Sequence, residues 1–198
     1  MSDQNKEEES YFKQRELERH EALRRERELK ALRQEEREGI VQTLSTTEDI
    51  ANEALELGFD AQTARVLPLV PMIEVAWADG TVSTDEESTV LDLAIRRGIE
   101  RGTASYEFLQ RLMTERPSSL FFERVNRVIM AMVASDPESW MTETLPELAI
   151  KVAEASGGFF GLGDKVAAEE RELIEKLAEQ LNVAQKNPDL AVFKPADE

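Results

Sequence analysis

One pattern occurs twice in this chain and restricts its fold more than any other feature. Residues 73–80 and 150–157 align without a gap, and five of the eight positions are identical: an Ile, a Val, two Ala and a Gly. After an insertion, residues 165–170 resume the pattern of residues 81–86, and the apolar positions beyond them also agree. Each copy has the features of an apolar helix, a glycine turn and a second helix that carries a glutamate. A chain that repeats such a unit is predicted to be an internally duplicated helical domain.

The sequence between and around the two copies also carries helix signals and shows no alternating strand pattern. The segment Ser45-Thr46-Thr47-Glu48 predicts a capping box that opens a helix, and Gly58 predicts its end. Pro71 is expected to begin an apolar helix at the centre of the core, ending near Ala78. Further helices are expected over residues 83–95, 103–113, 120–133, 136–155 and 169–181. The predicted fold is therefore all-α: a compact multi-helix bundle with an internal pseudo-duplication.

The first 39 residues differ in composition from the rest and predict a separate arm. They are strong helix formers with many Glu/Arg pairs at i,i+4 spacing, and their leucines are too irregular for a sustained coiled-coil heptad. We expect a solvated charged helix that ends at Gly39, with a coiled coil or a partner-binding arm as the alternative. The predicted organisation is an arm over residues 1–39, a helical domain over 40–184 and a loose tail over 185–198.

Composition excludes several classes of function. The chain has no cysteine and a single histidine, His20, so it lacks the residues for a disulfide, a thiol nucleophile, a sulfur-ligated zinc site or a Ser-His-Asp triad within the globular part. Its net charge of −17 argues against binding to nucleic acid or to anionic lipid. The sequence shows no signal peptide and no apolar run of membrane-spanning length, so we expect a cytoplasmic protein.

The acidic turn of the first copy has two interpretations. In the structural one, Gly80 makes the turn, Ser83 caps the next helix, Glu86 completes a capping box and Asp79 accepts hydrogen bonds from turn amides. In the functional one, the Asp and the Glu bind a hard cation. This site is not an EF-hand, because loop position twelve, counted from Asp79, is Val90. A metal site would need carboxylates from a second segment, and the second copy is the obvious donor.

The pattern Ala-Asp-Gly-x-Val-Ser-x-x-Glu at residues 78–86, after an apolar helix and repeated later, resembles the TerB family. That family is associated with tellurite resistance and shares its all-helical fold with the membrane-proximal domain of DjlA-type co-chaperones. The resemblance covers residues 60–182 and excludes the charged arm. It implies a fold of this type and a role in stress response through partner proteins.

The resemblance also implies a divalent-metal site, for Ca²⁺ or Mg²⁺, built from the Asp and Glu of the two turns. Asp79 and Glu86 match the family pattern in the first turn, and Glu170 matches in the second. Ser156 stands where the second Asp is expected, after which residues 158–164 are inserted. The insertion ends in Asp164, whose position makes it a candidate for the missing carboxylate.

Three functions follow from these observations. The first is a non-enzymatic TerB-like domain that binds a divalent cation and acts through protein partners. The second is a metal-independent, co-chaperone-like interaction module in which the acidic turns are caps. The third, an enzyme, is disfavoured because the chain lacks the Glu-x-x-His motifs of di-iron bundles and the repeated Asp motifs of two-metal hydrolases. Glu74 is an acid on an otherwise apolar helix. We expect it to pair with an Arg, to reach the surface or to join Asp79 in the candidate site. The sequence leaves the oligomeric state open.

Overall fold

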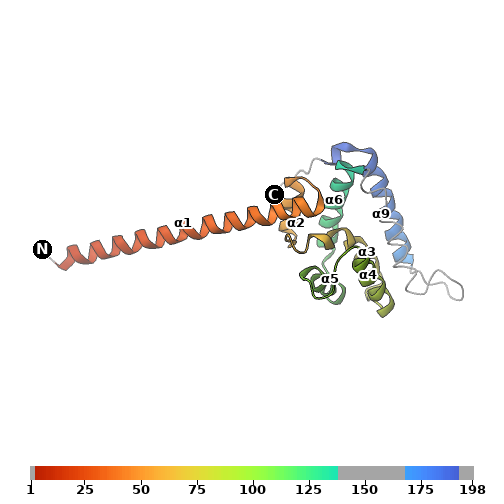
Figure 1. Ribbon diagram of the computed structural model, residues 1–198, viewed down its shortest axis with the longest axis horizontal. Helices are drawn as coiled ribbons and strands as arrows, with labels where there is room; N and C mark the ends of the chain where they lie inside the picture. The colour runs from red at the N-terminus through yellow and green to blue at the C-terminus, as the bar shows by residue number, and fades with distance from the viewer. Residues whose placement is uncertain (1–2, 138–167, 192–198) are drawn as a thin grey trace.

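The computed structural model of the chain describes residues 3–137 and 168–191, and every regular element in these ranges is a helix (Figure 1). This confirms the all-α prediction. The elements are α1 (Asp3–Leu44), α2 (Glu48–Glu56), η1 (Ala64–Leu69), α3 (Val70–Ala76), α4 (Thr84–Arg96), α5 (Ala104–Thr114), α6 (Ser119–Ser135), α9 (Ala168–Lys186) and η2 (Pro188–Ala191), where η marks a 3-10 helix.

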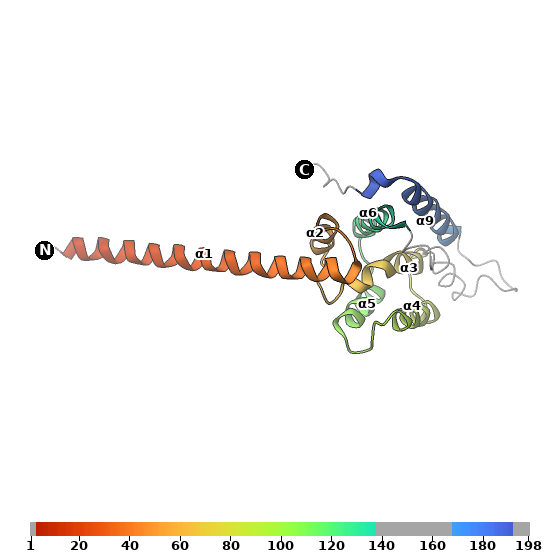
Figure 2. The same ribbon diagram turned by 45° about the horizontal axis from the view of Figure 1, so that its top comes forward.

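The short helix α3 is the centre around which the globular part is assembled. It contacts α4, α6 and α9, and in Figure 2 it lies between α4 and α5 on one side and α6 and α9 on the other. Six of its seven residues are buried, as its nearly continuous apolarity predicts. The two prolines act as expected: Pro68 lies within η1, and Pro71 lies in the first turn of α3, where its missing N–H breaks no helical hydrogen bond.

The core is built from side chains of α1, α2, η1, α3, α4, α5, α6 and α9. Phe59 is 1 % exposed and contacts two other aromatic rings, with centroids 5.4 Å from Phe108 and 6.2 Å from Phe121. Trp77 lies half-buried against the core, and its Nε1 donates to the carbonyl of Leu112 at 2.9 Å. This bond ties the end of α3 to α5.

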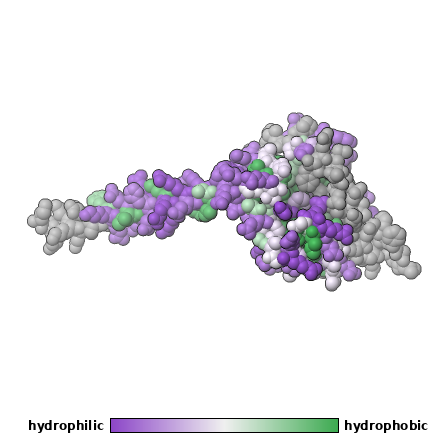
Figure 3. Space-filling model, viewed as in Figure 1, coloured by the Kyte–Doolittle hydropathy of each residue, from purple (hydrophilic) through white to green (hydrophobic). Residues whose placement is uncertain are grey.

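Helix α1 leaves the globular part as a long arm (Figure 1). Residues 12–35 are all exposed, and at about 1.5 Å per residue they span roughly 35 Å. Three ion pairs at i,i+4 spacing lie along the arm, for example Lys30 to Glu26 at 2.8 Å. Its hydrophobic residues form separate spots rather than a stripe on the face in Figure 3. The predicted charged helical arm is thus confirmed, and a coiled coil or a partner-binding arm stays the alternative prediction for its role.

The predicted end of this helix at Gly39 is wrong, because α1 continues to Leu44. Ile40 is fully buried in the core, so the last turns of α1 belong to the globular part. A Cβ at position 39 would overlap the Cβ of Ala61. The glycine is therefore explained by the close approach of the 60–63 turn to α1 and not by helix termination.

Most other helix starts agree with the sequence. Ser83, Thr103 and Ser118 each accept a hydrogen bond from a backbone N–H in the first turn of the helix that follows. The predicted capping box at 45–48 is wrong in register: the N-cap of α2 is Thr47, whose hydroxyl accepts from Ile50 N. Gly58 follows α2 with φ of 90°, as expected for a helix-ending glycine.

The C-terminal part has more regular structure than expected. Helix α9 runs to Lys186, and η2 then packs against α6. The predicted helices within 136–155 and the second copy of the repeat up to residue 167 lie outside the described residues.

Candidate functional site

The acidic turn between α3 and α4 is built by local backbone chemistry. Gly80 adopts φ of 97°, a left-handed conformation that reverses the chain after α3. The carboxylate of Asp79 is exposed, and its Oδ1 accepts from Thr81 N at 2.8 Å and from Thr81 Oγ1 at 3.2 Å. Asp79 therefore stabilises the turn in the way the structural interpretation predicts.

Glu86 completes the capping box of α4. Its Oε2 accepts from Ser83 N at 2.7 Å, and Ser83 Oγ accepts from Glu86 N at 3.2 Å. Glu86 is only 3 % exposed, so this carboxylate is oriented toward the helix start rather than into solvent. The reciprocal bonds satisfy two of the amides that a helix N-terminus leaves without intrahelical partners.

Glu170 is the predicted second-copy ligand that the structure describes. It lies on α9 and is 2 % exposed, so it is buried like Glu86 of α4. Asp164 and Ser156 lie outside the described residues.

The predicted metal ligands do not form a cluster within the described ranges. Over residues 3–137 and 168–191, no three His, Cys, Asp or Glu side chains lie close enough together to hold a metal ion. Asp79, Glu86 and Glu170 therefore do not make a three-ligand site by themselves. The fourth predicted ligand, Asp164, lies outside the described residues, so the four-carboxylate site stays a prediction.

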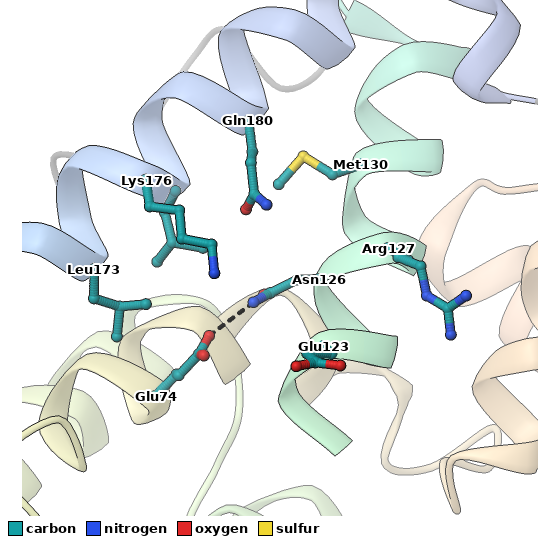
Figure 4. Close-up of a pocket in the computed structure, with 9 residues that line it drawn as sticks. Glu74, Glu123, Asn126, Arg127, Met130, Leu173, Lys176 and Gln180 are labelled. Carbon is teal, nitrogen blue, oxygen red and sulfur yellow. Dashed lines mark hydrogen bonds between the residues drawn. The ribbon is translucent and has the colours of Figure 1, made fainter. Parts of the chain in front are cut away.

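A different site lies between α3, α6 and α9 (Figure 4), where a cavity of about 440 Å³ opens. Its walls combine acidic, basic, amide and aliphatic side chains. They are Glu74 from α3; Glu123, Asn126, Arg127 and Met130 from α6; and Leu173, Lys176, Leu177 and Gln180 from α9. Such a mixture of apolar wall and a few polar groups is typical of sites for small ligands.

Glu74 and Asn126 form the polar floor of this cavity. Asn126 Nδ2 donates to Glu74 Oε2 at 2.7 Å, which joins α3 to α6. Burial raises the pKa of the Glu74 carboxyl; the Asn126 bond and the charge of Lys176 oppose this shift, and the charge of Glu123 adds to it. The other amide atom, Asn126 Oδ1, is buried and accepts no hydrogen bond within the described part of the chain.

The sequence pointed to Glu74 but not to its partner. It is half-buried at the cavity, and its hydrogen-bond partner is an amide rather than an Arg. Asn126 lies 52 residues away on α6, in the polar stretch Glu-Arg-Val-Asn-Arg at residues 123–127. Nothing in this stretch distinguishes Asn126 from its polar neighbours as the partner of Glu74.

Comparisons with protein-family models, with curated proteins and with solved structures find no match to this chain. Over the described residues, no helix has the length and apolar character that crossing a membrane requires.

Proposed function

We propose that this protein is a non-enzymatic, TerB-like interaction module that acts through protein partners and needs no bound metal. The observation that carries this proposal is the capping box of α4. Glu86, the best-matched ligand of the expected metal site, is 3 % exposed and accepts from Ser83 N at 2.7 Å. The burial and position of this carboxylate are therefore accounted for by its role at the start of its own helix, without a bound cation.

The arm supports an interaction role. Helix α1 holds 24 consecutive exposed residues, from 12 to 35, and carries the globular part at one end (Figure 1). Its exposed hydrophobic residues, such as Leu17 and Leu29, are scattered among charged ones and form no continuous apolar face. A charged helix of this kind is typical of a spacer between bodies. We assign the arm the role of holding the domain at a distance from a bound partner.

Cation binding, the function that the TerB resemblance implies, is the second candidate. One observation favours it: Glu86 of α4 and Glu170 of α9 are both buried carboxylates. In this version Asp79, Glu86, Asp164 and Glu170 together bind Ca²⁺ or Mg²⁺ and couple the ion to stress response.

Calorimetric titration of the full chain separates the two candidates. The protein is stripped with a chelator and titrated with calcium, then with magnesium. We expect no binding heat and no change in melting temperature. Calcium binding that is lost in Asp79→Ala with Glu86→Ala, and kept in the matched control Asp85→Ala with Glu87→Ala, would instead establish the cation-binding function. The control removes two carboxylates from the same first turn that are not in the predicted ligand set.

A further inference from the structure

The cavity between α3, α6 and α9 has a floor that accepts hydrogen bonds. Glu74 supplies a half-buried carboxylate, whose Oε2 accepts from Asn126 Nδ2 at 2.7 Å. Asn126 Oδ1 is buried beneath this floor, without surface that a ligand could reach. A group with several N–H bonds and a positive charge, such as an ammonium, pairs with a carboxylate at such a position.

The α9 wall offers the opposite chemistry. In Figure 4, Lys176 and Gln180 extend from α9 toward Glu74 and Asn126, so the ammonium of Lys176 and the amide of Gln180 face the same space as the floor. The charge of Lys176 also acts on Glu74, where it opposes the rise in the pKa of the carboxyl that burial causes. A carboxylate placed beside Lys176 would be held by an ion pair and by the Gln180 amide.

The charges of the lining balance. Glu74 and Glu123 are negatively charged, and Arg127 and Lys176 are positively charged. A purely anionic ligand would face two carboxylates, and a purely cationic one would face two cations. A ligand that carries one charge of each sign meets a partner for both.

The remaining wall is aliphatic. Met130 comes from α6, and Leu173 and Leu177 come from α9. Leu177 is 3 % exposed and packs with Val75 of α3, so this wall is anchored in the core. A branched aliphatic or thioether side chain of a ligand can pack against this wall and bury its apolar surface.

We propose that this cavity binds a small aliphatic zwitterion: a free α-amino acid with an apolar side chain, such as leucine or methionine. Its ammonium donates to the Glu74 carboxylate, and its carboxylate binds Lys176 and Gln180. Its side chain lies against Met130, Leu173 and Leu177. The volume of about 440 Å³ holds such a molecule. This role goes beyond the proposed interaction module and does not depend on metal.

The test is calorimetric titration of the full chain with leucine and three analogues that share its side chain. N-acetyl-leucine lacks the ammonium charge, leucinamide lacks the carboxylate, and isopentylamine keeps only the cation. We expect leucine to bind and each analogue to bind at least roughly tenfold more weakly, because each loses a charge-assisted contact. Absence of leucine binding at tens of millimolar, or equal binding of any analogue, would overturn the proposal.

Two pairs of variants locate the site. Glu74→Gln and Lys176→Met remove the two charged contacts, and each is expected to weaken leucine binding at least about tenfold. Glu172→Gln and Lys186→Met make the same changes at exposed positions of α9 outside the cavity, and leave binding unchanged. Melting curves of all four variants confirm that they fold. Leucine binding that survives both cavity variants would place the ligand elsewhere and contradict the assignment.

Discussion

At the scale of single residues, this acidic protein uses its carboxylates as acceptors for its own backbone and amide groups. Asp79 holds a turn, Glu86 closes a capping box, and Glu74 accepts from Asn126 across two helices. Another carboxylate, Glu53, accepts from Arg124 Nε at 2.9 Å and from its Nη2 at 2.6 Å, which joins α2 to α6. A carboxylate in this chain can therefore stabilise the fold and need not indicate a ligand-binding site.

The raised pKa of Glu74 makes stability depend on pH. Because its pKa in the folded state lies above the ordinary value of 4.5, the folded state binds the proton more tightly than the unfolded chain does. This side chain therefore lowers stability as pH rises above 4.5 through its folded pKa. We expect Glu74→Gln to gain stability relative to the wild type across that range, since Gln keeps an acceptor for Asn126.

Urea denaturation at a series of pH values from about 4 to 8 measures this difference. The exposed substitution Glu172→Gln controls for the loss of one charge from the acidic chain. A stability difference between Glu74→Gln and the wild type that stays constant with pH would contradict the assigned burial of Glu74.

Gly39 gives a second prediction, in which the sign of the effect is decisive. On an exposed helix, Gly→Ala stabilises by roughly 1 kcal/mol because alanine has the higher helix propensity. At position 39 a new Cβ overlaps that of Ala61, so we expect Gly39→Ala to destabilise by about 1–3 kcal/mol. Thermal and urea unfolding measure it, and a gain in stability would refute the close approach of α1 to Ala61.

At the scale of elements, the capping signals on the chain predict where most helices begin. Ser83 has the expected role, and Thr103 and Ser118 cap the helices expected over 103–113 and 120–133, because a cap acts on the next three residues only. The sequence did not predict features that depend on contacts between distant segments. Gly39 is a glycine because of Ala61, 22 positions later, and the pair Glu74–Asn126 depends on the packing of α3 against α6. Neither contact can be predicted from the residues that neighbour it in the sequence.

The arm is expected to be independent of the domain in stability. Residues 12–35 are exposed along their whole length, whereas Ile40 is fully buried. Deleting residues 1–33 should therefore leave the cooperative melting temperature of the domain nearly unchanged, while deleting residues 1–41 should lower it sharply. Circular dichroism melts compare the two truncations, and an equal effect of both would contradict the boundary placed between the arm and the core.

At the scale of the whole molecule, the chain combines a charged helical arm with a small all-α domain centred on α3. The fold class was predictable because helix periodicity, caps and proline positions all agree. The internal duplication stays a prediction, because most of the second copy lies outside the described residues. The candidate site was predictable only in part. Asp79, Glu86 and Glu170 were named from sequence, but the cavity of α3, α6 and α9 arises from three segments that no local pattern connects.

The central claim is that the acidic turn is a cap and not a metal site, and one measurement tests it most directly. Ser83→Ala removes the hydroxyl that accepts from Glu86 N, and lost caps of this kind cost about 1 kcal/mol. Unfolding of the wild type and of Ser83→Ala is measured with a chelator and with excess calcium. We predict the same cost in both conditions and an unchanged wild-type stability. A wild type stabilised by calcium, with a cost for Ser83→Ala that changes with the ion, would contradict the account.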